Sequence, residues 1–113
     1  MHEIGIIQGA LELAEQSARS SGATRIHRLK LRIGQMTGVV PDALQFAFEV
    51  VRQGTLAAEA SLELETVPAT CWCAACRTEF VAKDLQYDCP ACGQFSQELR
   101  RGLELELASL EVS

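Results

Sequence analysis

Two C-x2-C pairs constrain this chain more than any other feature. Cys73 and Cys76 form the first pair and Cys89 and Cys92 the second, with 12 residues between the pairs. Each pair places two sulfurs on one tight turn, and two facing turns make a tetrahedral site of four thiolates. The surrounding segment has few large apolar side chains, so a metal must hold it together. The pairs therefore predict a zinc-ribbon-like module with a structural Zn2+ on these four cysteines, although rubredoxin-like iron uses similar turns.

A closed four-thiolate site argues against a thiol enzyme. Such a site leaves no open coordination position for a substrate. A thiol–disulfide enzyme would also need a strand running straight into a helix at the C-x2-C motif, and no such pattern is present. Cys71, two residues before Cys73, offers an alternative ligand or is a spare cysteine. We therefore expect a protein that is not an enzyme, and the role of Cys71 stays open.

Charge and composition exclude several classes of protein. The 113 residues carry a formal net charge of −5, which disfavours nucleic-acid binding because that depends on clustered Lys and Arg. No apolar run approaches the roughly 18 residues that a membrane span needs. The chain also does not start with the basic and then apolar regions of a signal peptide. We therefore expect a cytoplasmic protein, in which paired cysteines bind metal rather than form disulfides.

Hydrophobic periodicity predicts two helices. Residues 4–20 place apolar side chains at helical spacing. A second helix begins at Pro41, where the missing N–H costs nothing, and ends at Gly54-Thr55. Its expected inner stripe consists of Leu44, Ala47, Phe48 and Val51, widened by Phe46 and Val50.

Three segments alternate with the period of half-buried strands. Residues 25–33 have apolar side chains on one face and basic side chains on the other, while 62–65 and 103–107 alternate Leu with Glu. We expect the basic strand to pair with at least one acidic strand, since opposite charges on neighbouring strands attract. Solvated charged faces are the alternative. His27 falls on the apolar face and is expected to be partly buried with its hydrogen bonds satisfied, rather than a ligand.

These elements predict an α/β (α+β) fold. A three-stranded sheet with two helices forms one discontinuous α/β domain over residues 1–68 and 99–113. The cysteine-rich segment, residues 69–98, forms an inserted zinc-binding domain.

The first three residues form a possible ligand set. Met1 is expected to remain, because the aminopeptidases that remove it require a small second residue. The α-amine, the His2 amide nitrogen and the His2 imidazole Nδ1 then form fused chelate rings, a geometry that suits Ni(II) or Cu(II). The Glu3 amide nitrogen completes a square plane, or the Glu3 carboxylate caps a higher-coordinate form. A histidine in second position is also common by chance, so the residues alone leave binding open.

Five motifs of the chain occur together and in this order: Met1-His2-Glu3, the helix segment 40–51 (VPDALQFAFEVV) with Gly54-Thr55, Glu65-x-Val67-Pro68-Ala69, Cys71-Trp72-Cys73-x-x-Cys76 and Cys89-Pro90-x-Cys92. In the order of these motifs, nearly the whole chain resembles the hydrogenase maturation nickel metallochaperone family HypA/HybF.

The resemblance implies a metallochaperone whose α/β domain binds nickel at Met1, His2 and Glu3. It implies zinc on the four C-x2-C sulfurs. It further implies delivery of nickel to the [NiFe]-hydrogenase large subunit together with the GTPase HypB, and in some members service to urease through its accessory proteins. Some relatives carry a histidine directly after the last cysteine, where this chain has Gly93, so no auxiliary metal role is expected there.

A competing hypothesis from a different class is a zinc-ribbon interaction or regulatory module that transports no metal. It predicts stoichiometric zinc without tight Ni(II) binding. The oligomeric state stays open between monomer and homodimer.

Overall fold

The computed structural model describes residues 3–113, apart from the side chain of Leu85. In chain order the elements are α1 (Glu3–Ser20), β1 (Ile26–Gly34), the short 3-10 helix η1 (Gln35–Thr37), α2 (Pro41–Val51), β2 (Ser61–Val67), β3 (Thr70–Cys73), β4 (Thr78–Val81), the 3-10 helix η2 (Lys83–Leu85), β5 (Glu98–Arg101) and β6 (Leu105–Val112). Between residues 3 and 113 no helix is long and apolar enough to cross a membrane.

The chain divides into two compact units, each with its own three-stranded sheet. The first unit contains the residues up to Arg32, Gly38–Glu65 and Glu106–Ser113, and the second contains Ile33–Thr37 and Thr66–Leu105. The sheet of the first unit has the order β2-β1-β6, and that of the second has the order β4-β3-β5. The predicted fold class, two helices and a three-stranded sheet plus an inserted cysteine-rich module, is confirmed.

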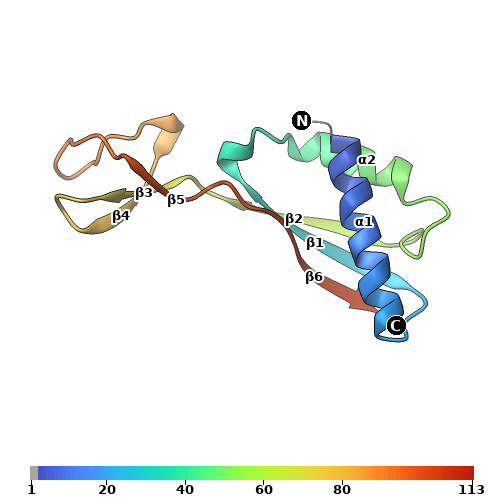
Figure 1. Cartoon of the computed structure of the whole chain (residues 1–113). Helices are drawn as coiled ribbons and strands as arrows, with labels where there is room; N and C mark the ends of the chain where they lie inside the picture. Colours follow the sequence, from blue (N-terminus) through green and yellow to red (C-terminus); the bar gives the residue numbers. More distant parts are fainter. Residues whose placement is uncertain (1–2) are drawn as a thin grey trace. The chain divides into compact units, whose positions relative to one another are not determined.

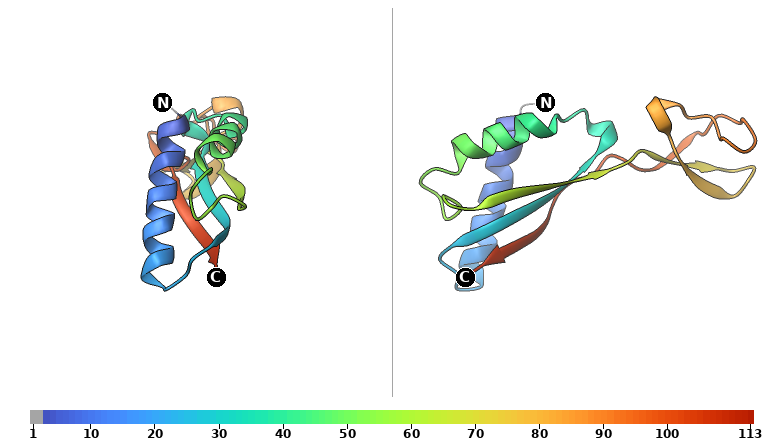
Figure 2. Two further views of the ribbon diagram at one scale, coloured as in Figure 1. Left: turned by 90° about the vertical axis from the view of Figure 1, so that its right-hand side faces the viewer. Right: turned by 180° about the vertical axis from the view of Figure 1, so that it is seen from behind.

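In the first unit, helix α1 lies across the sheet and contacts α2 (Figure 1). The helix buries its predicted stripe, which consists of Ile7, Leu11, Ala14 and Ala18. Strands β1 and β2 run in the same direction, as expected for strands joined through a helix, whereas β6 runs antiparallel to β1 (Figures 1 and 2). The end of β6 is held beside the start of β1, since Arg25 and Ser113 exchange backbone hydrogen bonds of 3.1 and 2.9 Å.

The basic strand β1 lies between the two acidic strands, which confirms the predicted pairing. Arg32 donates to Glu65 at 2.6 Å on one side and to Glu106 at 2.9 Å on the other. Arg28 likewise pairs with a glutamate of each neighbouring strand, Glu63 and Glu111. The charges therefore favour this strand order from both sides of β1.

Two details of the first unit differ from expectation. Phe46 and Val50 are 71% and 52% exposed, so they do not widen the inner stripe of α2, which buries Leu44, Ala47 and Phe48. The inner face of this short helix is already filled by those three residues. His27 is exposed rather than partly buried. It lies at the start of β1, where its Nε2 is 2.7 Å from the Ser113 hydroxyl.

The second unit is built on antiparallel pairs. Strand β3 pairs with β4, Cys71 opposite Phe80, and with β5, Cys71 opposite Leu99. The segment Ile33–Thr37 belongs to this unit because its backbone bonds to distant residues: Gly34 N donates to Glu104 O and Met36 N to Gly102 O, both at 2.7 Å.

The third predicted strand begins two residues later than expected, after a point where the backbones of Gly34 and Gly102 pass very close to each other. A Cβ added at Gly34 would lie 2.1 Å from the carbonyl carbon of Gly102, and Gly102 itself has a φ of +124°. Residues 102–104 belong to no strand, so β6 begins at Leu105 rather than at residue 103, and Leu103 is 66% exposed.

Candidate metal centre

Four cysteine sulfurs converge in the second unit. The ligand atoms of Cys73, Cys76, Cys89 and Cys92 all lie within 4.8 Å of one another. Sulfur to sulfur, Cys73 is 3.5 Å from Cys92, and Cys76 is 4.0 Å from Cys89. These separations cross between the two C-x2-C pairs and are too long for disulfides.

The donor set fits tetrahedral zinc. With zinc–sulfur bonds of about 2.3 Å, the sulfurs of a tetrahedron lie roughly 3.8 Å apart. The two cross-pair separations of 3.5 and 4.0 Å bracket that value. Among the described residues, 3–113, these four cysteines are the one place where three or more His, Cys, Asp or Glu side chains lie close enough together to hold a metal ion.

The two C-x2-C turns share one backbone feature. The residue after the second cysteine of each turn has a positive φ, 53° at Arg77 and 76° at Gly93. In the first turn the Cys76 N–H lies 3.4 Å from the Cys73 sulfur, and in the second the Gly93 N–H donates to the Cys89 carbonyl at 2.8 Å. Glycine adopts this φ without strain, so the Gly93 conformation suits its residue type, whereas the positive φ of Arg77 was not predicted from the sequence. The signal was available, because both residues occupy the same offset from a C-x2-C motif.

The surroundings give the sulfurs different proton affinities. Hydrogen bonds from the backbone N–H groups of Cys92 and Ala91 lower the pKa of the Cys89 thiol to about 7. Contacts with the neighbouring thiols, Cys92 first, raise the pKa of Cys76 to about 12. Cys89 therefore ionises more readily than Cys76. Since zinc binds thiolates, metal binding to this group must release protons and weaken in acid.

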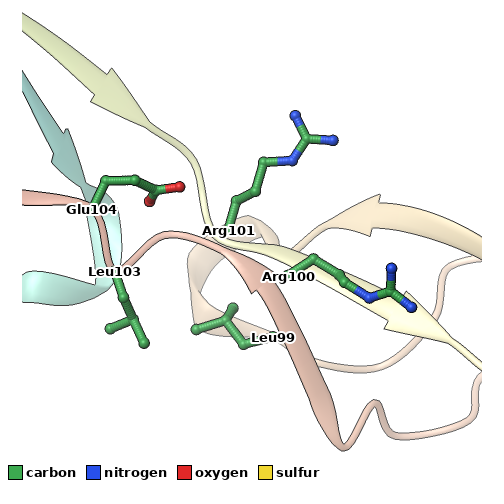
Figure 3. A pocket seen from close by; sticks show the side chains of 5 residues that line it. All are labelled: Leu99, Arg100, Arg101, Leu103 and Glu104. Atoms are coloured by element: carbon green, nitrogen blue, oxygen red, sulfur yellow. The ribbon is translucent and has the colours of Figure 1, made fainter. Parts of the chain in front are cut away.

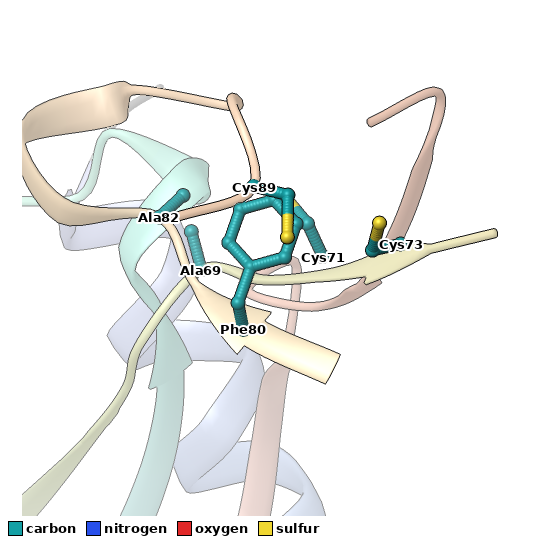
Figure 4. Packing of buried hydrophobic residues seen from close by; sticks show 6 residues of the cluster. All are labelled: Ala69, Cys71, Cys73, Phe80, Ala82 and Cys89. Atoms are coloured by element: carbon teal, nitrogen blue, oxygen red, sulfur yellow. The ribbon is translucent and has the colours of Figure 1, made fainter. Parts of the chain in front are cut away.

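A small hydrophobic cluster supports the sulfurs from behind. Its buried members are Ala69, Cys71, Cys73, Phe80, Ala82 and Cys89. Figure 4 shows the Phe80 ring in the middle of the cluster, with Cys71 and Cys89 beside it. Cys71 is 1% exposed and lies outside the four-sulfur group, so the structure places it in the core rather than at the metal site.

The second unit also has a pocket of about 290 Å³ whose lining includes Leu99, Leu103 and two arginines. The guanidinium groups of Arg100 and Arg101 do not converge on it (Figure 3). Arg100 pairs with Glu98 and stacks over Trp72, 4.3 Å from the ring centre, while Arg101 donates to Glu79 at 2.8 Å. Both cations are already paired, so this pocket is a poor anion site.

Of the three predicted nickel ligands, the structure describes only Glu3. Met1 and His2 lie outside the described residues, and Glu3 is the first residue of α1. The first four N–H groups of a helix have no partner within the helix. A bond from a metal to the Glu3 amide nitrogen would therefore break no hydrogen bond of α1.

Comparisons with known proteins agree over the whole length. The family model for HypA, hydrogenase/urease nickel incorporation, metallochaperone, matches residues 1–112. Hydrogenase maturation factor HypA of Picosynechococcus sp. is 50% identical over 112 residues, covering 99% of each chain. The protein of the same name from Acidithiobacillus ferrooxidans is 42% identical over 113 residues, again covering 99% of each chain.

A solved structure has the same fold. The solution structure of the Ni metallochaperone HypA from Helicobacter pylori aligns with 99% of this chain and 97% of its own, at 25% identity and a TM-score of 0.68. The match of the family model, the identity to curated relatives and the shared fold all point the same way. The chain belongs to the HypA family of hydrogenase/urease nickel-incorporation metallochaperones.

Proposed function

We propose that this protein binds Ni(II) through Met1, His2 and Glu3 and delivers it for maturation of [NiFe]-hydrogenase. One observation carries the proposal: the match to a nickel-incorporation family covers residues 1–112 and so includes the N-terminal chelate. The chemistry supports it, because amine, amide and imidazole nitrogens suit Ni(II). The position of Glu3 supports it as well, because the amide of the first residue of α1 has no hydrogen-bond partner within the helix.

In this proposal the two metals have different roles. Cys73, Cys76, Cys89 and Cys92 hold a structural zinc, because four thiolates leave no open position for exchange. The zinc-binding domain, residues 69–98, is inserted into a nickel-binding domain of residues 1–68 and 99–113. The nickel is the cargo, which passes to a receiving protein.

The protein works through contacts rather than catalysis. Its partners are the GTPase HypB and the [NiFe]-hydrogenase large subunit, and urease accessory proteins where urease is served. In this proposal the delivery takes place in the cytoplasm.

Metal analysis of the untagged protein tests the nickel site. His2→Ala, or a single residue added before Met1, should abolish tight Ni(II) binding, because either change disrupts the amine–amide–imidazole chelate. Zinc should stay at one equivalent in both variants. His27→Ala is the matched control, since it removes the other histidine, which is exposed in the first unit.

Isothermal titration with Ni(II) and elemental analysis for zinc give the result. Wild-type affinity for one equivalent of nickel in the extended protein would contradict the N-terminal site. Zinc at one equivalent without tight nickel binding in the wild type would favour the zinc-ribbon interaction module instead.

A further inference from the structure

The four cysteine sulfurs come from two separate turns, so the distance between the turns decides whether they can share one metal ion. Cys73 is the last residue of β3, and Cys89 opens the second turn later in the chain. Both are buried, whereas Cys76 and Cys92, the second cysteine of each turn, are exposed. The hydrogen bonds around the two buried cysteines therefore bear most directly on how the turns are held together.

The segment after the second turn runs back beside the residues that lead into it. The Cys89 N–H donates to the Gln94 carbonyl, and the Ser96 N–H donates to the Tyr87 carbonyl, both at 2.8 Å. An isolated antiparallel bridge lies between these two hydrogen bonds. The backbone of Ser96 is thus tied to the approach of the second turn.

The side chain of Ser96 reaches the approach of the first turn. Its hydroxyl donates to the Trp72 carbonyl at 2.7 Å, and that carbonyl belongs to the peptide bond between Trp72 and Cys73. The same oxygen accepts from the Glu98 N–H at 3.3 Å, at the start of β5, where Glu98 pairs with Trp72 across the sheet. Ser96 therefore connects the residue before Cys73 with the segment that leads into Cys89.

Burial gives these hydrogen bonds weight, and it also supplies a comparison. Among the described residues, Ser96 and Thr70 are the two buried polar side chains, at 9% and 8% exposure. The Thr70 hydroxyl donates to the Pro68 carbonyl at 3.2 Å, two residues away on the same segment. That hydrogen bond does not join the two turns, whereas the pair of bonds made by Ser96 does.

We propose that Ser96 is a positioning residue for the zinc. Its N–H and its hydroxyl hold the approach to Cys89 and the peptide bond of Cys73 together, so that the sulfurs keep the separation that a tetrahedral ion needs. The proposal rests on the zinc site of the proposed function and goes further by naming a residue outside the four ligands on which zinc retention depends. Groups that orient the ligands from behind typically change metal affinity by about 10–100-fold.

Zinc affinity of the full-length protein, measured in competition with a chelator, tests the assignment. Ser96→Ala removes the hydroxyl and keeps the backbone N–H, and it should weaken zinc binding on the order of 10-fold. Ser96→Thr keeps the hydroxyl and should stay within about twofold of the wild type. The added methyl group has room, because Ser96 lines two pockets of about 460 and 300 Å³.

Thr70→Val is the matched control. It removes a hydroxyl that is as buried as that of Ser96 and lies in the same unit. Pro68 is exposed, so its carbonyl can bond to water once the Thr70 hydroxyl is gone. This variant should therefore weaken zinc binding by less than about threefold.

Cobalt(II) in place of zinc separates positioning from a general loss of stability. Its ligand-field and thiolate charge-transfer bands depend on how the four sulfurs are arranged around the ion. At saturating cobalt, Ser96→Ala should have shifted or broadened bands, whereas Ser96→Thr and Thr70→Val should have the wild-type spectrum. A variant that only folds less tightly would have wild-type bands once it is saturated.

The possible results distinguish the proposals from one another. Wild-type zinc affinity in Ser96→Ala would overturn the role of Ser96, as would unshifted cobalt bands or an equal loss of affinity in Thr70→Val. If Ser96→Ala takes up no metal at all, Ser96→Thr decides: normal binding supports the role of the hydroxyl, and failure to bind overturns it.

The wild type reports on the proposed function separately. Less than one equivalent of zinc in the wild type would refute the four-thiolate site and the role of Ser96 with it. A normal wild type with an unaffected Ser96→Ala would refute the role of Ser96 alone. Nickel should bind at one equivalent in all three variants, because none of them changes a proposed nickel ligand.

Discussion

At the residue scale, Arg77 and Gly93 both have a positive φ, a conformation that is strained for arginine but not for glycine. Both follow the second cysteine of a C-x2-C turn, with φ of 53° and 76°. An L-residue with a side chain is strained in this region by about 1–2 kcal/mol, whereas glycine is not. Nothing lies within 4 Å of a Cβ added at Gly93, so backbone conformation alone sets the cost of a substitution there.

Substitutions at these two positions should therefore change the stability of the zinc-loaded protein in opposite directions. Arg77→Gly should stabilise the zinc-loaded protein by up to about 1 kcal/mol, after the greater entropy of glycine in the unfolded chain is subtracted. Gly93→Ala should destabilise it by about 1 kcal/mol. Zinc affinity in competition with a chelator measures both, because folding of this unit is coupled to metal binding. Equal effects of the same sign would show that φ does not govern the turns.

At the element scale, strand β1 is held by charge on both sides. The Arg32 guanidinium, hydrogen-bonded to Glu65, keeps the pKa of that carboxyl below its ordinary value of 4.5. In the unfolded chain Glu65 titrates at the ordinary value. The stabilisation is therefore present above that pH and is lost as the pH falls through the lower pKa of the folded state.

Glu65→Gln should remove this part of the acid sensitivity. The midpoint of urea unfolding, measured from about pH 6 to about pH 3, should fall less steeply in the variant than in the wild type. The difference should be small and should shrink in high salt, because the pair is exposed. Glu12→Gln, exposed on α1, is the control. A variant curve parallel to the wild type would exclude the ion pair as a source of pH dependence.

At the scale of the whole molecule, the two units depend on the metal to different degrees. The buried cluster of the second unit has Phe80 as its one large side chain, and two of its six members are the metal ligands Cys73 and Cys89 proposed above. The first unit buries Phe48 and several Ile and Leu side chains without any metal ligand among them. Loss of zinc should therefore unfold the second unit alone.

Hydrogen exchange after treatment with a strong chelator measures this prediction. Amides of residues 66–105 should lose protection, while those of α1 and α2 keep it. Residues 33–37 should lose protection as well, because their backbone bonds belong to the second unit. Retained protection in 66–105, or melting of α1, would contradict it. Acidification should release zinc in the same way, since the thiolates take up protons.

Sequence reasoning succeeds here where a pattern is local. The C-x2-C spacing predicted a cluster of four sulfurs, and periodicity predicted α1, β1 and α2, because both depend on residues close in the chain. Sequence reasoning fails where the structure of a segment depends on contacts with residues far away in the chain. The exposure of Phe46 depends on which side of α2 the sheet and α1 occupy. The start of β6 depends on a crossing of chains 68 residues apart, from Gly34 to Gly102, which no periodicity encodes.

That crossing has a consequence for how the sequence can change. Side chains packed in a core can compensate one another, one growing as its neighbour shrinks. Gly34 cannot take part in such an exchange, because an added Cβ would meet the backbone of Gly102 at 2.1 Å. Gly102 is no freer, since its own Cβ would lie 3.0 Å from the Ala69 backbone at an unfavourable φ. Neither glycine can become smaller, so no change at one position can permit a change at the other, and each should be indispensable on its own.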